Sequence, residues 1–575
     1  MGSVTTPGRQ FGPADDAMRR RGVVQRGETL DDAMCRSLSA LFDVDRAMNG
    51  VRDIQFEFRA RELIFGRVIA LSTAFLANAG RPGGVTASCT VLPLLTLRGE
   101  LDLENFTSES YAALAGAIGT GYDLSHLEFP DVALPGLNAQ LDRINEQLIL
   151  GGIRPVAGMA TLRADHPRIQ EFLRAKREAD FGAWRFTLSV SLAESLFQVA
   201  HSGLEWDLTD GHGQTVGCMD GEELLGDIAE TAHYCGEPGV VFKDRFDADN
   251  ATPAWPYVST APCAEVGMSY GEGCHFGYVN VSALVHDSRF DWDDFAEAVR
   301  VMTRILDAGV EITRLNSTSL NLSLVGPKRR IGVGLTGVAD MLIALRVPYD
   351  SAEALSISAR LSEMIDFHSK AASIDLARVR GRFPAFINSR YTSPSWVRRK
   401  SSRRAFVSED AWDELYKSIG SVGIRNATTT AMPSAETASA LVGSSTSLEP
   451  LLSIWDHGNA LRPVVREAMF NSWGLRRTEE WEESHRAEPE RCLDTCDLTE
   501  FPYLKVATQI DFRDHIRVQA AFQRFMDEGI SKTINMPRSC APSDVREAFG
   551  FAYSEGLKGV AVFRDGCLDE RDADQ

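Results

Sequence analysis

Apolar stretches with helical period alternate with short strand-like runs along most of this chain, and this alternation constrains the fold more than any other feature. Apolar residues recur with the period of an α-helix at 31–48, 103–117, 135–150, 291–308, 352–379 and 511–528. Runs suited to strands lie between them, at 67–71, 185–192, 239–243, 319–325 and 559–563. Alternating strands and helices favour an α/β architecture. Residues 1–30 are expected to form a loose arm, and residues 473–500 an exposed helix and loop.

Composition narrows the classes of function. The net charge of −20 argues against general attraction to nucleic acid or to an anionic membrane surface. The sequence has no run of eighteen apolar residues and no N-terminal apolar signal core, so we expect a cytoplasmic protein. Ten cysteines in 575 residues do not form a secreted disulfide framework, and in a reducing compartment single thiols become candidates for chemistry.

Cys263 and Glu265, in the stretch APCAE, carry the first chemical hypothesis. In an extended segment, residues two apart point to the same side, so a thiol and a carboxylate would face one cavity. This pairing suits chemistry in which sulfur takes a hydrogen atom and a carboxylate takes a proton. Two further cysteines, Cys274 and Cys89, lie eleven residues downstream and far upstream. By spacing alone, ordinary structural residues are the better explanation of the pattern.

Short motifs in a fixed order strengthen this hypothesis. They are STAFLANAG (72–80), SCTVLP (88–93), GTGYDLS (119–125), RADHPRIQEF (163–172), PGVVFKDR (238–245), PCAE (262–265), CHFGYVN (274–280), RRIGVGLTGVADMLIALRVPYDS (329–351), IRNATTTAMPSAETAS (424–439), SKTINMP (531–537) and GLKGVAVFRDG (556–566). In this order and at these separations the chain resembles the catalytic subunit of ribonucleotide reductase, from about residue 60 to 567.

The resemblance implies a fold. It is a ten-stranded α/β barrel of the type shared with glycyl radical enzymes, built from two five-stranded halves, with the loop that bears Cys263 at its centre. We expect an N-terminal arm and helical region over residues 1–60, the catalytic barrel over 61–567 and a short tail over 568–575.

The resemblance also implies a role for each active-site residue. Cys263 corresponds to the cysteine that becomes a thiyl radical and abstracts the ribose 3′ hydrogen. Glu265 corresponds to the carboxylate near the 3′-hydroxyl. Cys89 and Cys274 correspond to the dithiol that reduces the substrate and ends as a disulfide.

The stretch PSAETAS is small, hydroxyl-rich and leads into a helix-like segment. An ordinary helix cap would have this composition, but helix N-termini also favour anions. The resemblance assigns the substrate phosphates to this loop and adds two lining residues upstream. The predicted substrate-binding residues are therefore Thr73, Ser88, Ala261, Ser434, Ala435, Glu436, Thr437, Ala438 and Ser439.

The radical source is predicted from the C-terminal part of the chain. The sequence has no adjacent tyrosine pair and no C-terminal glycyl-radical motif, so it resembles the adenosylcobalamin-dependent class. Adenosylcobalamin is thus the expected cofactor, without a protein-bound metal. The expected partners are a ribonucleotide substrate and an external dithiol or thioredoxin-like reductant, with a monomer or homodimer as the assembly. A separate radical-generating subunit is the less favoured alternative.

Four departures from the family pattern leave the substrate open. Asparagine is expected at two positions that here are Ala261 and Thr187. The glycine-rich specificity loop is replaced by HLEFPDVALPGLN, and the usual C-terminal CxxC is missing. Cys492 and Cys496 are either unremarkable loop thiols or a redox relay. A diverged radical enzyme that modifies an unusual nucleotide, with or without net reduction, is therefore the alternative function.

Overall fold

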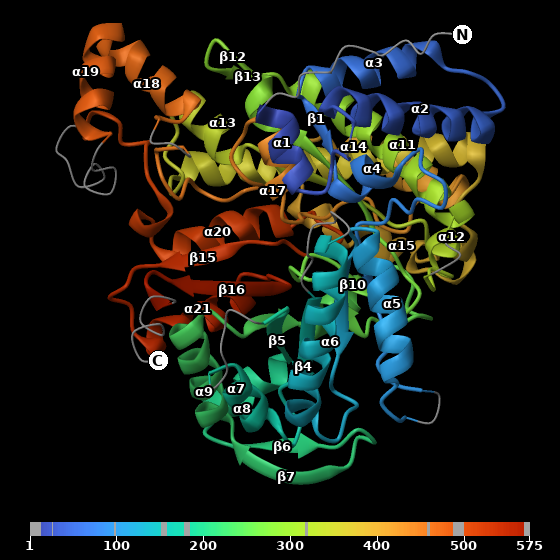
Figure 1. The fold of residues 1–575 in the computed structure, drawn as a ribbon, viewed down its shortest axis with the longest axis vertical. Helices are drawn as coiled ribbons and strands as arrows, with labels where there is room; N and C mark the ends of the chain where they lie inside the picture. Colours follow the sequence, from blue (N-terminus) through green and yellow to red (C-terminus); the bar gives the residue numbers. More distant parts are fainter. Residues whose placement is uncertain are drawn as a thin grey trace.

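The computed structural model describes residues 13–25, 27–96, 99–150, 158–177, 184–316, 320–456, 460–486 and 499–567. Five parallel strands form the first half of a barrel. In spatial order they are β2 (Cys89–Val91), β3 (Gly119–Asp123), β4 (Gly158–Arg163), β5 (Phe186–Leu192) and β8 (Gly239–Phe242). Figure 1 shows β4 and β5 in the lower half of the molecule.

The second half is also parallel and runs in the opposite direction. It consists of β11 (His275–Asn280), β14 (Ile331–Thr336), the extended segment 428–432, β15 (Thr533–Met536) and β16 (Gly559–Arg564). The segment 428–432 joins through parallel bridges from Thr430 to Val333 and from Met432 to Ile530. Antiparallel pairs then close the circle, β16 with β8 on one side and Cys89 with Cys274 on the other. The predicted barrel of two five-stranded halves is confirmed.

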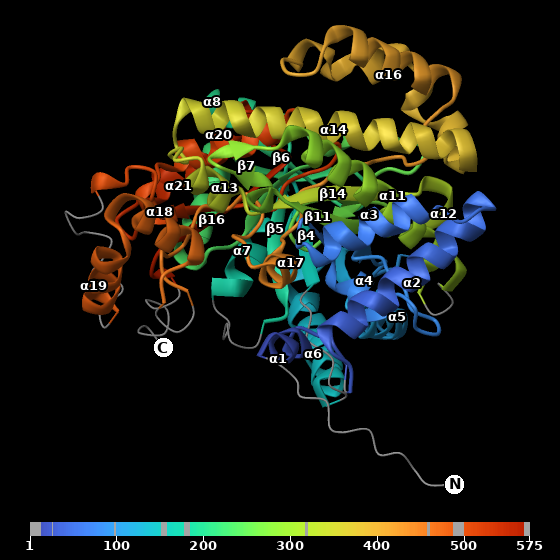
Figure 2. The same cartoon turned by 90° about the horizontal axis from the view of Figure 1, so that it is seen from above.

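Helices cover the outside of both halves. Those of the first half are α5 (Leu103–Ala115), α6 (Pro130–Leu150), α7 (Ile169–Arg177), α8 (Glu194–His201), α9 (Gly221–Cys235) and α10 (Lys243–Asp249). Those of the second half are α11 (Trp292–Asn316), α12 (Val325–Lys328), α13 (Val338–Ala344), α14 (Ala352–Arg380), α15 (Pro394–Val397), α16 (Glu409–Ser421), α17 (Glu436–Val442), α18 (Pro463–Trp473), α19 (Leu475–His485), α20 (Phe512–Gln523) and α21 (Pro542–Ser554). The long α14 lies across one side of the barrel, with α16 outside it (Figure 2).

Helices also precede the barrel. They are α1 (Pro13–Arg20), α2 (Leu30–Asn49), α3 (Ile54–Phe65) and α4 (Thr73–Asn78), with β1 (Ile69–Leu71) added antiparallel to β11. A capping box of Thr29 and Asp32 starts α2, and Gly50 ends it at a φ of 70°. The expected loose arm is thus wrong for residues 13–20, which form α1 and pack against α17.

Three short hairpins complete the chain: β6 (Glu205–Thr209) with β7 (Thr215–Asp220), β9 (Ser259–Thr260) with β10 (Gly267–Met268), and β12 (Val285–His286) with β13 (Arg289–Phe290). All six predicted helices are present. The strand predicted at 319–325 is wrong over its described part, where 320–324 form a turn before α12. Leu320 and Leu322 are buried there as core contacts, and their alternation with polar residues imitates a strand.

In the described part of the chain, no helix is both long enough and apolar enough to cross a membrane.

Candidate active site

Cys263 lies at the tip of the hairpin formed by β9 and β10, which enters the barrel. The tip is closed by hydrogen bonds from the Ala261 N–H to the Val266 C=O at 2.8 Å and from the Ala264 N–H to the Ala261 C=O at 2.9 Å. Ala264 adopts a positive φ of 58°, an uncommon conformation for a residue with a side chain. The Glu265 carboxylate accepts the Cys263 backbone N–H at 3.0 Å. The thiol and the carboxylate thus share one turn.

Glycines on β3 make room for this hairpin. A Cβ at Gly121 would lie 2.0 Å from the Thr260 carbonyl oxygen, and a Cβ at Gly119 would lie 2.9 Å from the Pro262 ring. Any larger residue at either position would push the hairpin out of the barrel. The glycines of the GTGYDLS motif are therefore required so that the hairpin can pack against β3.

A buried ion-pair network holds the base of the hairpin. The Arg330 guanidinium donates to the Gly267 C=O at 2.7 Å and pairs with both Glu272 and Glu528. Glu528 in turn accepts the Gly267 N–H at 3.2 Å and the Tyr257 hydroxyl at 3.1 Å. Arg330, Glu272 and Glu528 are each at most 2% exposed. We assign these residues a positioning role, which the sequence motifs did not reveal.

Cys89 and Cys274 are cross-strand partners at the seam between the two halves. The Ser88 N–H donates to the Cys274 C=O at 2.8 Å, and the Cys274 N–H donates to the Cys89 C=O at 3.3 Å. Directly opposed residues of an antiparallel pair have Cα atoms about 4.5–5.5 Å apart, which is within the range of a disulfide. Both are buried free thiols.

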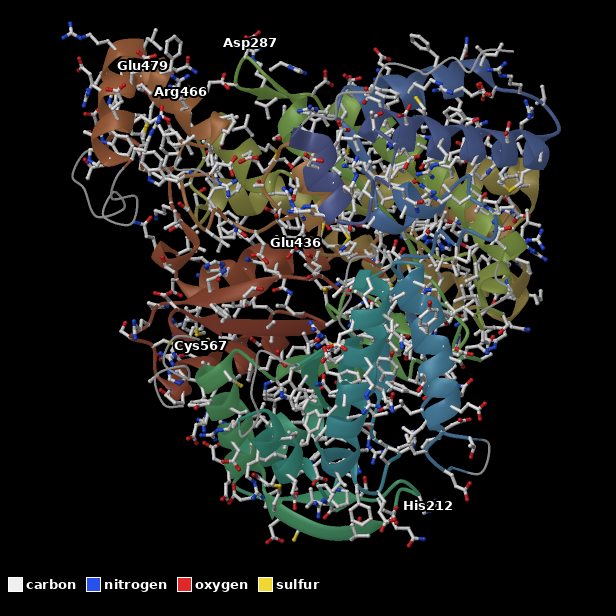
Figure 3. The ribbon with its side chains drawn as sticks, in the orientation of Figure 1. His212, Asp287, Glu436, Arg466, Glu479 and Cys567 are labelled. Carbon is white, nitrogen blue, oxygen red and sulfur yellow. The ribbon has the colours of Figure 1, made fainter. Side chains whose placement is uncertain are left out.

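A cavity of about 390 Å³ brings most of the predicted residues together. Its lining includes Thr73, Ser88, Cys89, Cys263, Glu265, Ser434, Ala435, Glu436, Thr437 and Ala438. Figure 3 shows Glu436 near the centre of the molecule. Three predicted residues lie outside the lining. Cys274 sits behind Cys89, Ala261 is fully buried in the hairpin, and Ser439 bonds back to the Glu436 C=O at 3.0 Å.

The far end of this cavity is rich in hydroxyl groups. The Ser72 and Ser88 hydroxyls bond each other at 2.9 Å, and the Tyr278 hydroxyl donates to the Ser434 C=O at 2.9 Å. Tyr278 also lines the cavity. Because α17 has only seven residues, its dipole is a smaller factor than the sequence suggested. Side-chain hydroxyls carry more of the predicted phosphate contact.

Arg21 also lines the cavity, although it lies in the segment expected to be a loose arm. Its guanidinium has no hydrogen bond or ion pair with any residue that the structure describes, and it follows α1 directly. The packing of α1 on α17 places this cation beside the PSAETAS loop. No local sequence signal connects residue 21 with residues 433–439. Their proximity is seen only in the folded structure.

Burial sets the protonation of the active-site groups. Burial, reinforced by the nearby Glu265 carboxylate, raises the pKa of all three cysteine thiols, Cys89, Cys263 and Cys274. Cys263, unlike the other two, is exposed where it lines the cavity, and the protein around its thiol is what raises its pKa. Burial also raises the pKa of Glu265 to about 7, although the Cys263 N–H opposes this rise. At neutral pH the cysteines are therefore thiols that can give hydrogen atoms, and Glu265 can exchange a proton.

Of the two positions where asparagine was expected, one is buried beside the active-site cysteines and the other is exposed away from the cavity. Ala261 lies in an apolar cluster with Cys89 and Cys274. Thr187 is on β5, is exposed, and does not line the cavity. Cys492 and Cys496 lie outside the described residues.

Comparison with known proteins agrees with this architecture. The family described as ribonucleotide reductase, barrel domain, matches residues 134–563. A vitamin B12-dependent ribonucleoside-diphosphate reductase of Mycobacterium tuberculosis is 30% identical over 517 residues, covering 85% of this chain and 69% of that protein. A protein of the same name from Thermoplasma acidophilum is 27% identical and covers 85% of this chain and 62% of its own length.

A solved structure shows the same fold. The alpha subunit of the Actinobacillus ureae class Id ribonucleotide reductase superposes with a TM-score of 0.73 at 16% identity, over 97% of this chain and 98% of that chain. The barrel-domain family matches most of the chain, and the Mycobacterium tuberculosis reductase is 30% identical to it. This protein therefore belongs to the ribonucleotide reductase family.

Proposed function

We propose that the chain reduces ribonucleotides to 2′-deoxyribonucleotides through a thiyl radical on Cys263, with adenosylcobalamin as the radical source. One observation carries the proposal. A single thiol, a carboxylate of raised pKa and Cys89 line one cavity in the centre of the barrel, and Cys274 is the cross-strand partner of Cys89. That set contains each group that the reduction requires, and the relatives named above are vitamin B12-dependent reductases.

The proposed steps balance in atoms and electrons. The Cys263 thiyl takes the ribose 3′ hydrogen atom, and Glu265 accepts the 3′-hydroxyl proton. The 2′-hydroxyl leaves as water with a proton from the dithiol. The second thiol hydrogen of the pair goes to C2′ as a hydrogen atom, and the remaining electron reduces the C3′ ketone while Glu265 returns its proton to the 3′ oxygen. Cys89 and Cys274 have then supplied two electrons and become a disulfide. Cys263 returns its hydrogen atom to C3′, which regenerates the thiyl.

A second cleft, of about 460 Å³, is large enough for the deoxyadenosyl group of the proposed cofactor. It adjoins the active-site cavity, since Ser434 and Glu436 line both. Ser531 lines the cleft, and its hydroxyl lies near enough to the Cys263 thiol to oppose the rise of that thiol's pKa, so the cleft reaches the reacting sulfur. Hydroxyl side chains of 444–447 and the Phe563 ring would contact the cofactor there. When bound, adenosylcobalamin supplies, by homolysis of its cobalt–carbon bond, a carbon radical that can oxidise the Cys263 thiol.

The phosphates of the substrate are assigned to the hydroxyl-rich end of the cavity. Ser434, Thr437 and the Arg21 guanidinium offer hydrogen-bond donors there. Arginine forms strong charge-assisted hydrogen bonds with phosphate oxygens. The related proteins named above are ribonucleoside-diphosphate reductases, and we propose a diphosphate as the substrate here. An external dithiol or a thioredoxin-like protein would reduce the disulfide after each turnover.

Anaerobic incubation with adenosylcobalamin, dithiothreitol and each of the four common ribonucleoside diphosphates tests the proposal. The expected product is the 2′-deoxynucleotide, and electron paramagnetic resonance should show cob(II)alamin coupled to a thiyl. A lack of cobalamin binding combined with activation by a metal-containing partner protein would overturn the radical source.

Ala261 favours a second candidate function. Its methyl group, buried at the base of the hairpin tip, places no hydrogen-bonding side chain there. A substrate with an altered ribose, or a rearrangement without net reduction, is compatible with that change. Cobalamin homolysis without deoxynucleotide formation from any common diphosphate would favour this candidate.

A further inference from the structure

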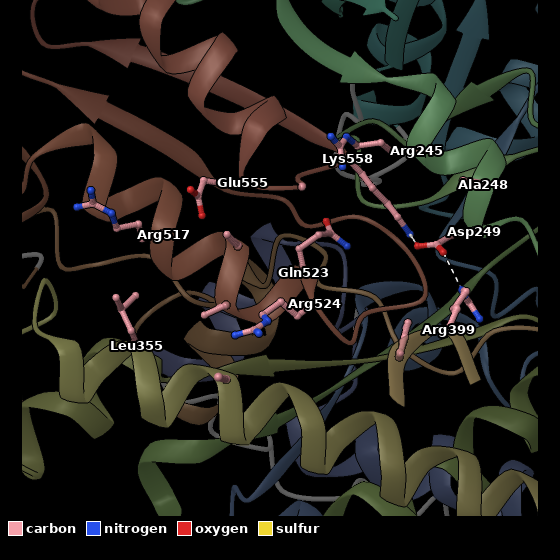
Figure 4. A pocket seen from close by; sticks show the side chains of 15 residues that line it. Arg245, Ala248, Asp249, Leu355, Arg399, Arg517, Gln523, Arg524, Glu555 and Lys558 are labelled. Carbon is pink, nitrogen blue, oxygen red and sulfur yellow. Dashed lines mark hydrogen bonds and ion pairs between the residues drawn. The ribbon is translucent and has the colours of Figure 1, made fainter. Parts of the chain in front are cut away.

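A separate cavity, of about 690 Å³, lies between α10, α14 and α20 (Figure 4). The loop that leads from α21 into β16 closes it, and it shares no lining residue with the cavity that contains Cys263. Six cationic side chains line it: Arg245, Arg399, Lys400, Arg517, Arg524 and Lys558. They face two carboxylates, Asp249 and Glu555. Such an excess of positive charge is notable in a chain with a net charge of −20.

Carboxylates pair with four of the six cations. Lys400 pairs with Asp527 at 3.4 Å, and Arg517 pairs with Asp514 at 2.7 Å. Asp249 is shared between Lys558, at 2.8 Å, and Arg399, at 3.0 Å. Figure 4 shows both contacts. The side chains of Arg245 and Arg524 form no ion pair with any residue in the described ranges. The Arg245 guanidinium donates one N–H to the Tyr553 C=O at 2.8 Å and lies over the Tyr553 ring, so its other N–H groups and those of Arg524 are available to an anion.

Two of the cations are buried, so their electrostatic attraction for a bound anion is stronger than that of exposed cations. Lys400 and Lys558 are 7% and 3% exposed. Burial lowers the pKa of Lys400 to about 8, even though Asp366 and Asp527 oppose this shift. Electrostatic attraction between a ligand and such desolvated charges is screened much less than attraction at a free surface.

The inner wall of the cavity touches the segment that supports the catalytic hairpin. The Gln523 amide donates to the Glu528 C=O at 2.7 Å, and the Lys558 ammonium donates to the Asp527 C=O. Gly529, which follows Glu528 in the sequence, donates its N–H to the backbone C=O of Glu265 at 2.8 Å. A ligand in this cavity would thus lie a few hydrogen bonds from the catalytic carboxylate, on the other side of residues 527–529.

We propose that this cavity binds a small molecule that carries two or more phosphate groups. Six cations around one cavity match several phosphate oxygens, and arginine in particular offers paired donors to them. A volume of about 690 Å³ accommodates a ligand of nucleotide size.

Isothermal titration calorimetry of the full chain with inorganic tripolyphosphate, at physiological ionic strength, tests the proposal. The decisive variant is R517A/R524A, which removes two cations from the outer wall. The Arg517 side chain is 45% exposed and Arg524 is also exposed, so the fold should survive, and thermal unfolding checks this. We expect the affinity to fall by about tenfold for each arginine removed. The matched control is R513A, because Arg513 is on the same helix but does not line the cavity.

The substrate cavity is the competing phosphate site, and R21A separates the two. Binding that is retained in R21A and R513A but weakened in R517A/R524A supports the proposal. Binding that is unchanged in R517A/R524A, or no binding to the wild-type chain at millimolar tripolyphosphate, overturns it. Titration with ATP then identifies the source: tighter binding of ATP indicates a nucleotide, and equal binding indicates recognition of the phosphates alone.

Discussion

Cys89 and Cys274 oppose each other across the antiparallel seam where the two halves of the barrel meet. Their pairing joins the two halves and places Cys89 in the wall of the active-site cavity, with Cys274 behind it. Closing a disulfide there needs little backbone movement, because opposed cross-strand residues already have suitable spacing.

Replacing either cysteine of this pair should therefore stop reduction. C89S and C274S should each yield no deoxynucleotide, while C235S, at another buried thiol, should keep the wild-type rate. Thiol titration after one anaerobic turnover without external dithiol should show two thiols lost per chain. Unchanged multiple turnover in C89S and C274S would disprove net reduction by this pair and favour a rearrangement.

Cys263 is predicted to be essential for radical chemistry but not for folding. C263A should abolish product formation and the coupled thiyl signal in electron paramagnetic resonance. The side chain faces the cavity, so loss of its sulfur leaves the packing intact, and the thermal unfolding midpoint should stay close to that of the wild type. Product formation by a folded C263A protein would refute the assignment.

Glu265 should impose a pH dependence on turnover. Its pKa is raised to about 7 by burial, and only the ionised form can accept the 3′-hydroxyl proton. The value of kcat/KM should therefore rise with pH through about 7, and at pH 6 only about a tenth of the carboxyl is ionised. E265Q should lower kcat by about 10²–10⁴ and remove this limb of the profile. If kcat/KM of E265Q still changed with pH around 7, a group other than Glu265 would be the base.

Local patterns predicted the six helices and several of the strands, because periodicity is a local property, and the order of the motifs predicted the barrel. They did not predict the seam between Cys89 and Cys274, since register across 185 residues depends on tertiary packing. Arg330 and Glu528, which are separated by 198 residues, meet only after the barrel closes. Arg21 was missed for the same reason. The strand expected at 319–325 failed because buried leucines in a turn imitate β alternation.

Arg21 should contribute to substrate affinity rather than to chemistry. R21A should raise KM for the diphosphate by about ten- to a hundredfold, the range expected for a lost charged hydrogen bond, with kcat little changed. R20A is the matched control, because Arg20 is exposed on the same turn and does not line the cavity. Steady-state kinetics separates the two parameters. An equal effect of R20A and R21A would indicate a general electrostatic contribution instead of a specific contact.

Arg330 should matter for stability and for the position of Cys263 at once. R330M leaves the buried Glu272 and Glu528 carboxylates without their shared partner, and breaking a buried ion pair costs about 3–5 kcal/mol. The urea unfolding midpoint should fall accordingly, whereas R378M, at an ion-paired arginine that is 49% exposed, should cost less than about 1 kcal/mol. In R330M/E528Q the buried negative charge is smaller, so part of the lost stability should return. Activity should not return with it, because the Gly267 C=O still lacks the guanidinium that holds the base of the hairpin. Full recovery of both would show that Arg330 only balances charge and does not position the catalytic loop.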